Sequence, residues 1–330
     1  MIISKTPLRI SFFSGGSDMP AFYEKEAGAA LSVTIDKYIY VMVHDSPHLG
    51  IRTVYDAIET YPDVETMQHL ITKEALKYYG HHANLTIASI SDILARGSGL
   101  GSSSAFTVGL VNALAATTYY TPSRSYLAET ACDIEMNRCG YPVGKQDQYA
   151  AAYGGFNLLE FHKTGKVTTS HVNVENETWR KLEDNLILVY SGYGRSANGI
   201  LQKQQDAMSD KKKFEMVKRS RNKAYVAHQM LIENDVDKFG ELLHEAWIDK
   251  KSVVESISDK FFDKVYDGAL KHGATGGKLL GAGGGGFFLF YAPKIVHPGV
   301  RDAITQASEG TCAFYDFKFV DRGSQIVAIS

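Results

Sequence analysis

The segment Gly97-Ser-Gly-Leu-Gly-Ser-Ser-Ser-Ala105 is the most informative stretch of the chain. It stands between the β-branched run Leu85-Thr-Ile-Ala-Ser-Ile90 and a run of small and apolar residues that extends from Ser102 to about Ala116. The first run predicts a strand, and the second predicts a helix buried on all sides because it lacks a polar face. Glycines let the backbone approach a ligand closely, and a helix N-terminus offers free N–H groups. The segment therefore predicts a loop that cradles phosphate.

Other phosphate-binding patterns fit this chain less well. A Walker A loop needs Ser or Thr after its Gly-Lys pair, and Gly277-Lys-Leu279 lacks that hydroxyl. The glycine pattern at Gly281–Gly286 precedes a strand-like run instead of opening a helix, which disfavours a dinucleotide-binding fold. The protein-kinase HRD and DFG signatures are absent. A hydrolase nucleophile elbow at Gly101–Ala105 stays open as an alternative, with Asp259 and His272 as formal partners.

The remaining pattern mixes strands and helices and predicts an α+β fold. Strands are expected at Leu8–Phe13, within Ala30–Val43, at Leu186–Tyr190 and at Phe287–Tyr291. Helices are expected after the Thr121-Pro122 pair as N-cap and first residue, from Ser196 to about Asn234, and over Phe261–Leu270. A domain boundary is expected near residues 180–195.

Composition bounds the class of protein. The chain has 330 residues with 44% hydrophobic and 22% charged residues, which is typical of a globular protein with a substantial core. The 35 basic and 37 acidic residues nearly cancel, so the charge favours neither nucleic acid nor a membrane as partner. Cys132, Cys139 and Cys312 form no CxxC pair, and no apolar leader is recognised, so a cytoplasmic location is expected. His44 and His48 have the spacing of metal ligands only if the segment is helical, but the composition of Asp45–Pro47 predicts a turn, which disfavours a metal site.

Three motifs in order resemble those of the GHMP superfamily of small-molecule kinases. They are Pro7–Asp18, the glycine loop Gly97–Ala105 and Gly281–Phe287, and Gly144-Lys-Gln-Asp-Gln-Tyr-Ala150 matches the GxxDQ segment of the family. The resemblance implies a two-domain fold with ATP and a sugar bound between the domains. It places a ribosomal S5 domain 2-like, ATP-binding domain at residues 1–185 and a ferredoxin-like domain at residues 186–330.

The same resemblance implies roles for individual residues. Asp147 matches the catalytic aspartate that accepts or orients the proton of the attacking hydroxyl, and Arg9 matches the basic residue that stabilises charge beside it. Ser103 and Glu135 match the ligands of Mg²⁺. The positions that match the nucleotide phosphate site are Gly97, Gly99, Leu100, Gly101, Ser102, Ser103 and Ser104. The positions expected to bind the acceptor are Gly15, Gly16, Ser17, Asp18, Lys145, Arg195, Gly283 and Gly284.

The first motif bears on the acceptor. Gly15 and Gly16 stand where galactokinases carry a Glu-His pair, while Asp18 is retained, which disfavours galactose. The amino-acid sequences of these motifs are most similar to those of the bacterial heptose kinases of the superfamily. That similarity implies phosphorylation of the anomeric C1 hydroxyl of D-glycero-D-manno-heptose 7-phosphate, giving the 1,7-bisphosphate for nucleotide-activated heptose and surface polysaccharide. Lys145, Arg195 and Arg96 are candidates to meet the phosphate of such a substrate.

Two departures and two alternatives accompany this interpretation. Ser14 and Ala95 stand where the family usually has Gly and Pro. One alternative is a GHMP kinase for another sugar such as fucose, and the other is a catalytically silent sugar-sensing protein on the same scaffold. The oligomeric state stays open, with a homodimer among the options.

Overall fold

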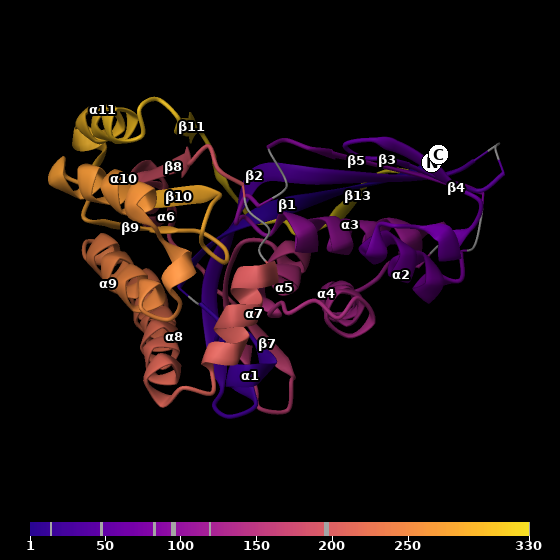
Figure 1. Ribbon diagram of the computed structural model, residues 1–330, viewed down its shortest axis with the longest axis horizontal. Coiled ribbons are helices and arrows are strands. Elements are labelled where there is room, and N and C mark those ends of the chain that lie inside the picture. Colours follow the sequence, from indigo (N-terminus) through magenta and orange to yellow (C-terminus); the bar gives the residue numbers. More distant parts are fainter. Residues whose placement is uncertain are drawn as a thin grey trace.

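The computed structural model describes residues 1–13, 15–46, 49–81, 84–93, 97–118, 120–194 and 198–329. Over these ranges the chain forms two β-sheets with helices packed against them (Figure 1), which confirms the α+β prediction. The larger sheet is built from β1 (Ile2–Phe13), β2 (Gly28–Asp45), β3 (Ile51–Val54), β4 (Ile58–Tyr61), β5 (Leu85–Ser91), β6 (Phe156–Phe161), β7 (Val167–His171), β12 (Phe319–Val320) and β13 (Gln325–Ile329).

Strand β2 is the central strand of this sheet. It is one continuous strand of 18 residues, where the sequence predicted strands within a shorter range. Its first half pairs with β6 and its second half with β5, while β1 runs antiparallel along most of its length. Because β1 carries Arg9 opposite Thr34, near the middle of this pairing, the arginine emerges from a rigid part of the sheet.

The smaller sheet contains β8 (Leu186–Tyr190), β9 (Gly276–Leu279), β10 (Phe287–Tyr291) and β11 (Ala313–Tyr315) in the order β11-β8-β10-β9. Helices follow β8 and separate β10 from β11, which is the βαββαβ pattern of the predicted ferredoxin-like domain. Strand β9 is an addition to the predicted elements. A Cβ atom at Gly276 would lie 1.9 Å from the Gly240 carbonyl oxygen, so glycine permits the close packing of this strand on a neighbouring helix.

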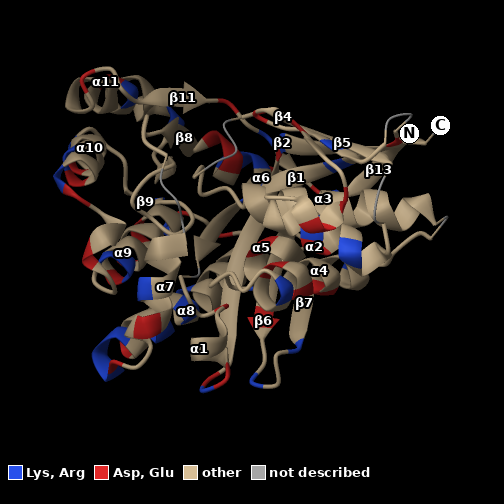
Figure 2. Cartoon of the chain, turned by 45° about the vertical axis from the view of Figure 1, so that its right-hand side comes forward, with Lys and Arg blue, Asp and Glu red and all other residues tan. Residues whose placement is uncertain are grey.

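The helices lie against both sheets (Figure 2). They are α1 (Pro20–Tyr23), α2 (Leu70–Tyr79), α3 (Ser102–Thr117), α4 (Arg124–Cys132), α5 (Gln146–Tyr153), α6 (Asn176–Asp184), α7 (Asn198–Ala207), α8 (Lys211–Ile232), α9 (Phe239–Lys251), α10 (Lys260–Lys271) and α11 (His297–Ala307). Short 3₁₀ turns occur at Val64–Thr66, Glu255–Ile257 and Lys294–Val296. Helix α3 is buried from Ala105 to Ala115 apart from one partly exposed position, as its composition predicted.

Two predicted helix boundaries were wrong. The helix expected to start at Thr121-Pro122 begins at Arg124, because the Ser123 hydroxyl caps it by accepting a hydrogen bond from the Tyr126 N–H. The helix expected from Ser196 to Asn234 is two helices in its described part, α7 and α8. The Asp210 side chain accepts from two backbone N–H groups and starts the second of them.

Helix α4 continues directly into a π-helical turn, Asp133–Arg138. Turns of this kind are rare and frequently occur at functional sites. Here the turn carries Glu135, which the wider winding directs into the interior, where the residue is 1% exposed.

The C-terminal segment returns to the larger sheet. Strand β12 pairs with β2, and β13 pairs with β1, so the two ends of the chain lie side by side (Figure 1). None of the helices in the described ranges has the length and apolar character needed to cross a membrane.

Candidate functional site

The glycine loop at residues 97–101 lines a cavity of about 900 Å³. Gly97, Gly99 and Gly101 all have positive φ angles, between 67° and 77°, which glycine adopts without strain. The Leu100 carbonyl accepts a 3.0 Å hydrogen bond from the Arg9 N–H, which ties the loop to β1. Helix α3 begins at Ser102, so its free N–H groups are presented at the same place.

The third glycine-rich segment supports this loop from behind. A Cβ atom at Gly99 would lie 2.6 Å from the Leu280 carbonyl oxygen, and one at Gly281 would lie 2.5 Å from the Cα atom of Gly99. The Phe287 N–H donates a 2.9 Å hydrogen bond to the Ser98 carbonyl. The two glycine segments are therefore in backbone contact, which side chains would prevent.

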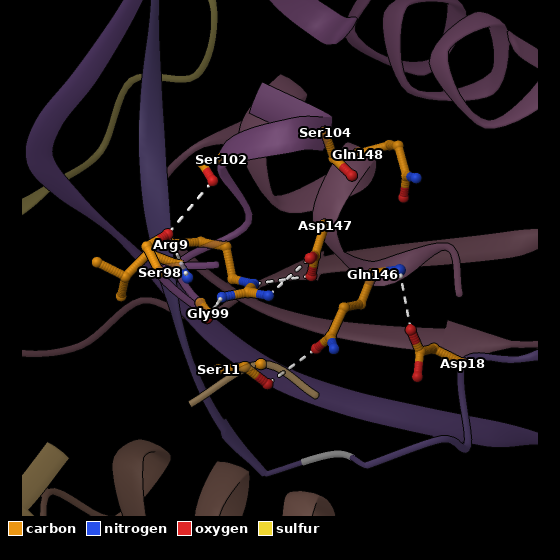
Figure 3. Close-up of polar contacts among 12 residues, drawn as sticks. Arg9, Ser11, Asp18, Ser98, Gly99, Ser102, Ser104, Gln146, Asp147 and Gln148 are labelled. Atoms are coloured by element: carbon orange, nitrogen blue, oxygen red, sulfur yellow. Dashed lines mark hydrogen bonds and ion pairs between the residues drawn. The ribbon is translucent and has the colours of Figure 1, made fainter. Parts of the chain in front are cut away.

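Arg9 and Asp147 form a bidentate ion pair beside the loop (Figure 3). Arg9 Nε donates to Asp147 Oδ1 at 2.8 Å, and Nη2 donates to Oδ2 at 2.6 Å. Arg9 Nη1 donates to the Gly99 carbonyl at 2.7 Å. The guanidinium is nearly buried, whereas the side chain of Asp147 is 25% exposed and lines the cavity. One planar cation thus fixes both the carboxylate and the loop.

Asp18 and Gln146 lie beside this pair and line the same cavity. The Gln146 Oε1 atom accepts from the Ser11 hydroxyl at 2.8 Å, which fixes the orientation of the amide (Figure 3). Asp18 is 5% exposed. Burial, together with the nearby Asp147, raises the pKa of Asp18 to about 6. A Cβ atom at Gly144 would lie 1.9 Å from Asp18 Oδ2, so the glycine makes room for this carboxyl group.

Glu135 lies in the same cavity, on the π-helical turn. Its Oε2 atom accepts from the Ser104 hydroxyl at 3.0 Å and from the Gln148 amide at 3.1 Å. Its buried Oε1 atom has no hydrogen-bond partner among the residues that the structure describes. Burial raises the pKa of Glu135 to about 7. A carboxyl group with one satisfied and one orphaned oxygen fits a cation with oxygen ligands.

The predicted site residues divide into two groups. Those that line the cavity are Arg9, Gly15, Gly16, Asp18, Gly97, Gly99, Gly101, Ser102, Ser103, Ser104, Glu135 and Asp147. Ser103 is exposed on the first turn of α3, and its neighbour Ser104 is the serine hydrogen-bonded to Glu135. Leu100 is fully buried and contributes its backbone to the loop.

Four predicted residues have other contacts. The Ser17 hydroxyl donates to the Ala29 carbonyl at 2.8 Å. The Lys145 ammonium donates to the Gly165 carbonyl at 2.5 Å. The Gly284 N–H donates a hydrogen bond to the Ile257 carbonyl, and Gly283 packs on the same residue. Arg195, Arg96, Ser14, Ala95 and His48 lie outside the described residues. The roles assigned to all of these residues stay predictions.

An aromatic group in the cavity was not anticipated from the sequence. The rings of Tyr55, His69 and Phe106 lie with their centroids 5.1 to 5.5 Å apart, and Ile39 and Ile71 line the cavity with them. Helix α7 adds Asn198, Leu201 and Gln204 to the cavity lining. These residues belong to no sequence motif, and only the fold assembles them.

The residues of the hydrolase alternative lie elsewhere. Asp259 caps α10 by accepting from the N–H groups of Phe261 and Phe262, and His272 contacts the Gly268 carbonyl at the other end of that helix. Neither residue is among the described residues that line the cavity. His44 lies in β2, and the described residues contain no group of three His, Cys, Asp or Glu side chains arranged for a metal ion.

Comparison with known proteins agrees with this geometry. The family model for the GHMP kinases N terminal domain matches residues 67–155, and the model for the GHMP kinases C terminal domain matches residues 227–310. The chain belongs to the GHMP kinases. This result confirms the predicted family, its fold class and the assignment as a kinase.

Three relatives place the GHMP kinase in context. The chain is 28% identical to the D-glycero-alpha-D-manno-heptose 7-phosphate kinase of Campylobacter jejuni, with 88% of this chain and 89% of that protein covered. It is 26% identical to the bifunctional fucokinase/GDP-fucose pyrophosphorylase of Arabidopsis thaliana, over 87% of this chain and 29% of that protein. A crystal structure described as a D-glycero-D-manno-heptose 1-phosphate kinase from Bacteroides thetaiotaomicron superposes with a TM-score of 0.80 at 24% identity and covers both chains completely, which shows a shared fold.

Proposed function

We propose that this GHMP kinase transfers the γ-phosphoryl group of ATP to a sugar hydroxyl, and that the acceptor is the anomeric hydroxyl of D-glycero-D-manno-heptose 7-phosphate. The observation that carries the proposal is the Arg9–Asp147 pair, which lies in one cavity with the glycine loop and with Asp18. The 28% identity to the heptose 7-phosphate kinase supports the choice of acceptor.

The glycine loop and the N-terminus of α3 are suited to the phosphates of the nucleotide. Backbone N–H groups and the positive end of the helix dipole stabilise anions without a side chain. The apolar and aromatic lining formed by Ile39, Tyr55 and Phe106 is suited to a flat base such as adenine. The cavity therefore offers a place for each part of ATP.

Asp147 is suited to handle the proton of the acceptor hydroxyl. Each carboxylate oxygen has more than one acceptor site, so the two hydrogen bonds from Arg9 leave capacity for a hydroxyl proton. Arg9 holds the carboxylate in one orientation and places positive charge next to the transferring group. Phosphoryl transfer depends mainly on such positioning and charge stabilisation.

Glu135 and a serine of the first turn of α3 would hold Mg²⁺, and the buried orphaned Oε1 atom of Glu135 fits that role. Bound there, the ion would neutralise the charge that develops on the phosphates during transfer. The remaining protein groups do the orienting, since Ser104 and Gln148 fix the other oxygen of the glutamate.

Asp18, Gln146 and the glycines at positions 15 and 16 line the part of the cavity next to Asp147 and would bind the sugar. A second acceptor class, an unphosphorylated sugar such as fucose, is favoured by one observation. Among the described residues that line the cavity, Arg9 is the one Lys or Arg, and it is already paired with Asp147. A phosphorylated sugar would therefore need a cation from outside this set.

The test is Mg·ATP-dependent ADP release with a panel of acceptors. The panel contains heptose 7-phosphate, free heptose, mannose 6-phosphate, fucose, galactose and mevalonate, with Asp147→Asn as the control. The proposal predicts strong turnover with heptose 7-phosphate and its loss in the variant. Turnover restricted to a free sugar would retain the mechanism and refute the acceptor, and no turnover with any acceptor would refute both.

A further inference from the structure

Two buried lysines lie behind the glycine loop. Lys250, on α9, is 6% exposed, and Lys278, on β9, is 3% exposed. The Lys250 ammonium donates to the Leu279 carbonyl at 3.0 Å and to the Gly281 carbonyl at 2.5 Å. The Lys278 ammonium donates to the Phe12 carbonyl at 2.8 Å. Among the described residues neither lysine has a carboxylate partner. Burying an ammonium group without an opposite charge is costly, so this arrangement calls for a reason.

Both lysines are attached to the backbone that builds the site. Gly281, held by Lys250, is in backbone contact with Gly99, whose carbonyl in turn accepts from Arg9. Lys278 holds the end of β1, the strand that carries Arg9. The two lysines and Arg9 are thus three basic side chains gathered around the glycine loop, and among the described residues the one acidic side chain bound to this group is Asp147, which pairs with Arg9.

We propose that Lys250 and Lys278 are positioning residues whose buried ammonium groups are held in the charged form by the phosphate groups of a nucleotide bound on the opposite side of the glycine loop. The inference rests on the proposed function, because it requires a nucleotide at that loop. Charges separated by a thin, poorly hydrated layer of backbone interact far more strongly than charges in water. The lysines therefore destabilise the unloaded enzyme and strengthen nucleotide binding.

The surroundings of Lys250 support this assignment. Burial, with a smaller contribution from Arg9, lowers the pKa of Lys250 to about 7. Burial also lowers the pKa of Lys278 well below its ordinary value, with Lys250 and Arg9 adding to the effect. The neighbouring Asp249 does not offset these charges, since it pairs with Arg219 and Lys223 of α8.

The sign of the pH effect follows. Between about pH 7 and pH 10.5 the unfolded chain binds a proton at Lys250 that the unloaded folded protein does not hold. The stability of the unloaded enzyme therefore rises with pH across this window. A bound polyphosphate favours the charged lysine, so nucleotide affinity is expected to fall as pH rises above 7.

The experiment compares Lys250→Met and Lys250→Gln with the wild type, using thermal unfolding and direct titration with Mg·ATP at pH 7. Methionine fills the space without charge, and glutamine keeps a hydrogen-bond donor without charge. We expect the unloaded variants to unfold at the same or a higher temperature, and Mg·ATP to bind at least about tenfold more weakly to both. Lys223→Met is the matched control, because Lys223 has an acidic partner in Asp249 at 2.7 Å. That variant should unfold at a lower temperature and bind Mg·ATP as the wild type does.

The outcomes separate this inference from the proposed function. A wild type that binds no Mg·ATP would overturn both. A wild type that binds Mg·ATP, with Lys250→Gln binding equally well, would show that the lysine serves only as a hydrogen-bond donor and would overturn the inference alone. If both Lys250 variants fail to fold, Lys278→Met and the pH dependence of wild-type binding between pH 7 and pH 9 decide the matter. Unchanged affinity in those two measurements would refute the inference.

Discussion

The two ends of the cavity are built from different parts of the chain. The donor end, formed by Gly97, Gly99 and Gly101 with the start of α3, presents backbone groups. The acceptor end, formed by Arg9, Asp18, Gln146 and Asp147, presents side chains, and Arg9, Gln146 and Asp147 are held by other side chains. The donor end should therefore be damaged by adding a Cβ atom, and the acceptor end by removing a functional group. Substitutions at the two ends should separate nucleotide binding from catalysis.

A large effect is expected at the acceptor end for Arg9→Lys, second only to that of removing the Asp147 carboxylate. A lysine cannot contact both oxygens of Asp147 and the Gly99 carbonyl at once, although it keeps the charge. We expect kcat to fall by about 10²- to 10³-fold. Steady-state kinetics at saturating Mg·ATP measures this loss, with circular dichroism to verify the fold. A kcat within threefold of the wild type would mean that the bidentate geometry of the Arg9 guanidinium is unimportant for turnover.

At the donor end, Gly99→Ala should lower both stability and nucleotide affinity. Alanine at φ 77° is strained, and its Cβ atom would lie 2.6 Å from the Leu280 carbonyl oxygen. We expect a loss of about 1–3 kcal/mol in the free energy of unfolding. Gly80→Ala is the matched control, because Gly80 has a φ of 73° and no described residue lies within 4 Å of the added Cβ atom. Equal losses in chemical denaturation would show that the contact with Leu280 adds nothing to the backbone strain.

Asp18→Asn should raise the stability of the protein and lower its activity. The pKa of Asp18 is raised from 3.8 to about 6, so the folded protein loses stability as pH rises through that window. An asparagine avoids this cost, and the variant should be more stable above pH 6 by up to about 3 kcal/mol. The difference should vanish below pH 3.8. Denaturation at several pH values measures it, and a variant that is less stable at neutral pH would contradict the assignment. Turnover should fall in the same variant.

The smallest effect on stability is expected for Gly15→Ala. The added Cβ atom has Ser220 Oγ as its nearest neighbour at 3.9 Å, and the φ angle of Gly15 is not positive. We expect the free energy of unfolding to change by less than about 0.5 kcal/mol. The KM for the acceptor should rise while the KM for ATP stays unchanged, because Gly15 lines the cavity near Asp18. A change in the KM for ATP alone would contradict this assignment and indicate that Gly15 belongs to the donor end.

The donor end could be predicted from the sequence because its residues are contiguous. Glycines with positive φ and a following helix leave a local pattern, and so does the Asp147 segment. The aromatic group could not be predicted, because Tyr55, His69 and Phe106 come from separate elements that only the tertiary structure brings together. The buried lysines also escaped prediction, since a lysine in a helix or strand is ordinarily solvated. The return of β12 and β13 to the first sheet likewise carries no signal in the sequence, because short strands pair non-locally.

The most direct test of the account is a single-turnover experiment on Asp147→Asn with nucleotide affinity measured in parallel. The variant keeps the shape of the side chain and leaves the donor end untouched. We predict that Mg·ATP binds with wild-type affinity while phosphoryl transfer to the acceptor slows by about 10²- to 10⁴-fold. Transfer at the wild-type rate would contradict the role of Asp147 and the division of the cavity into a donor end and an acceptor end.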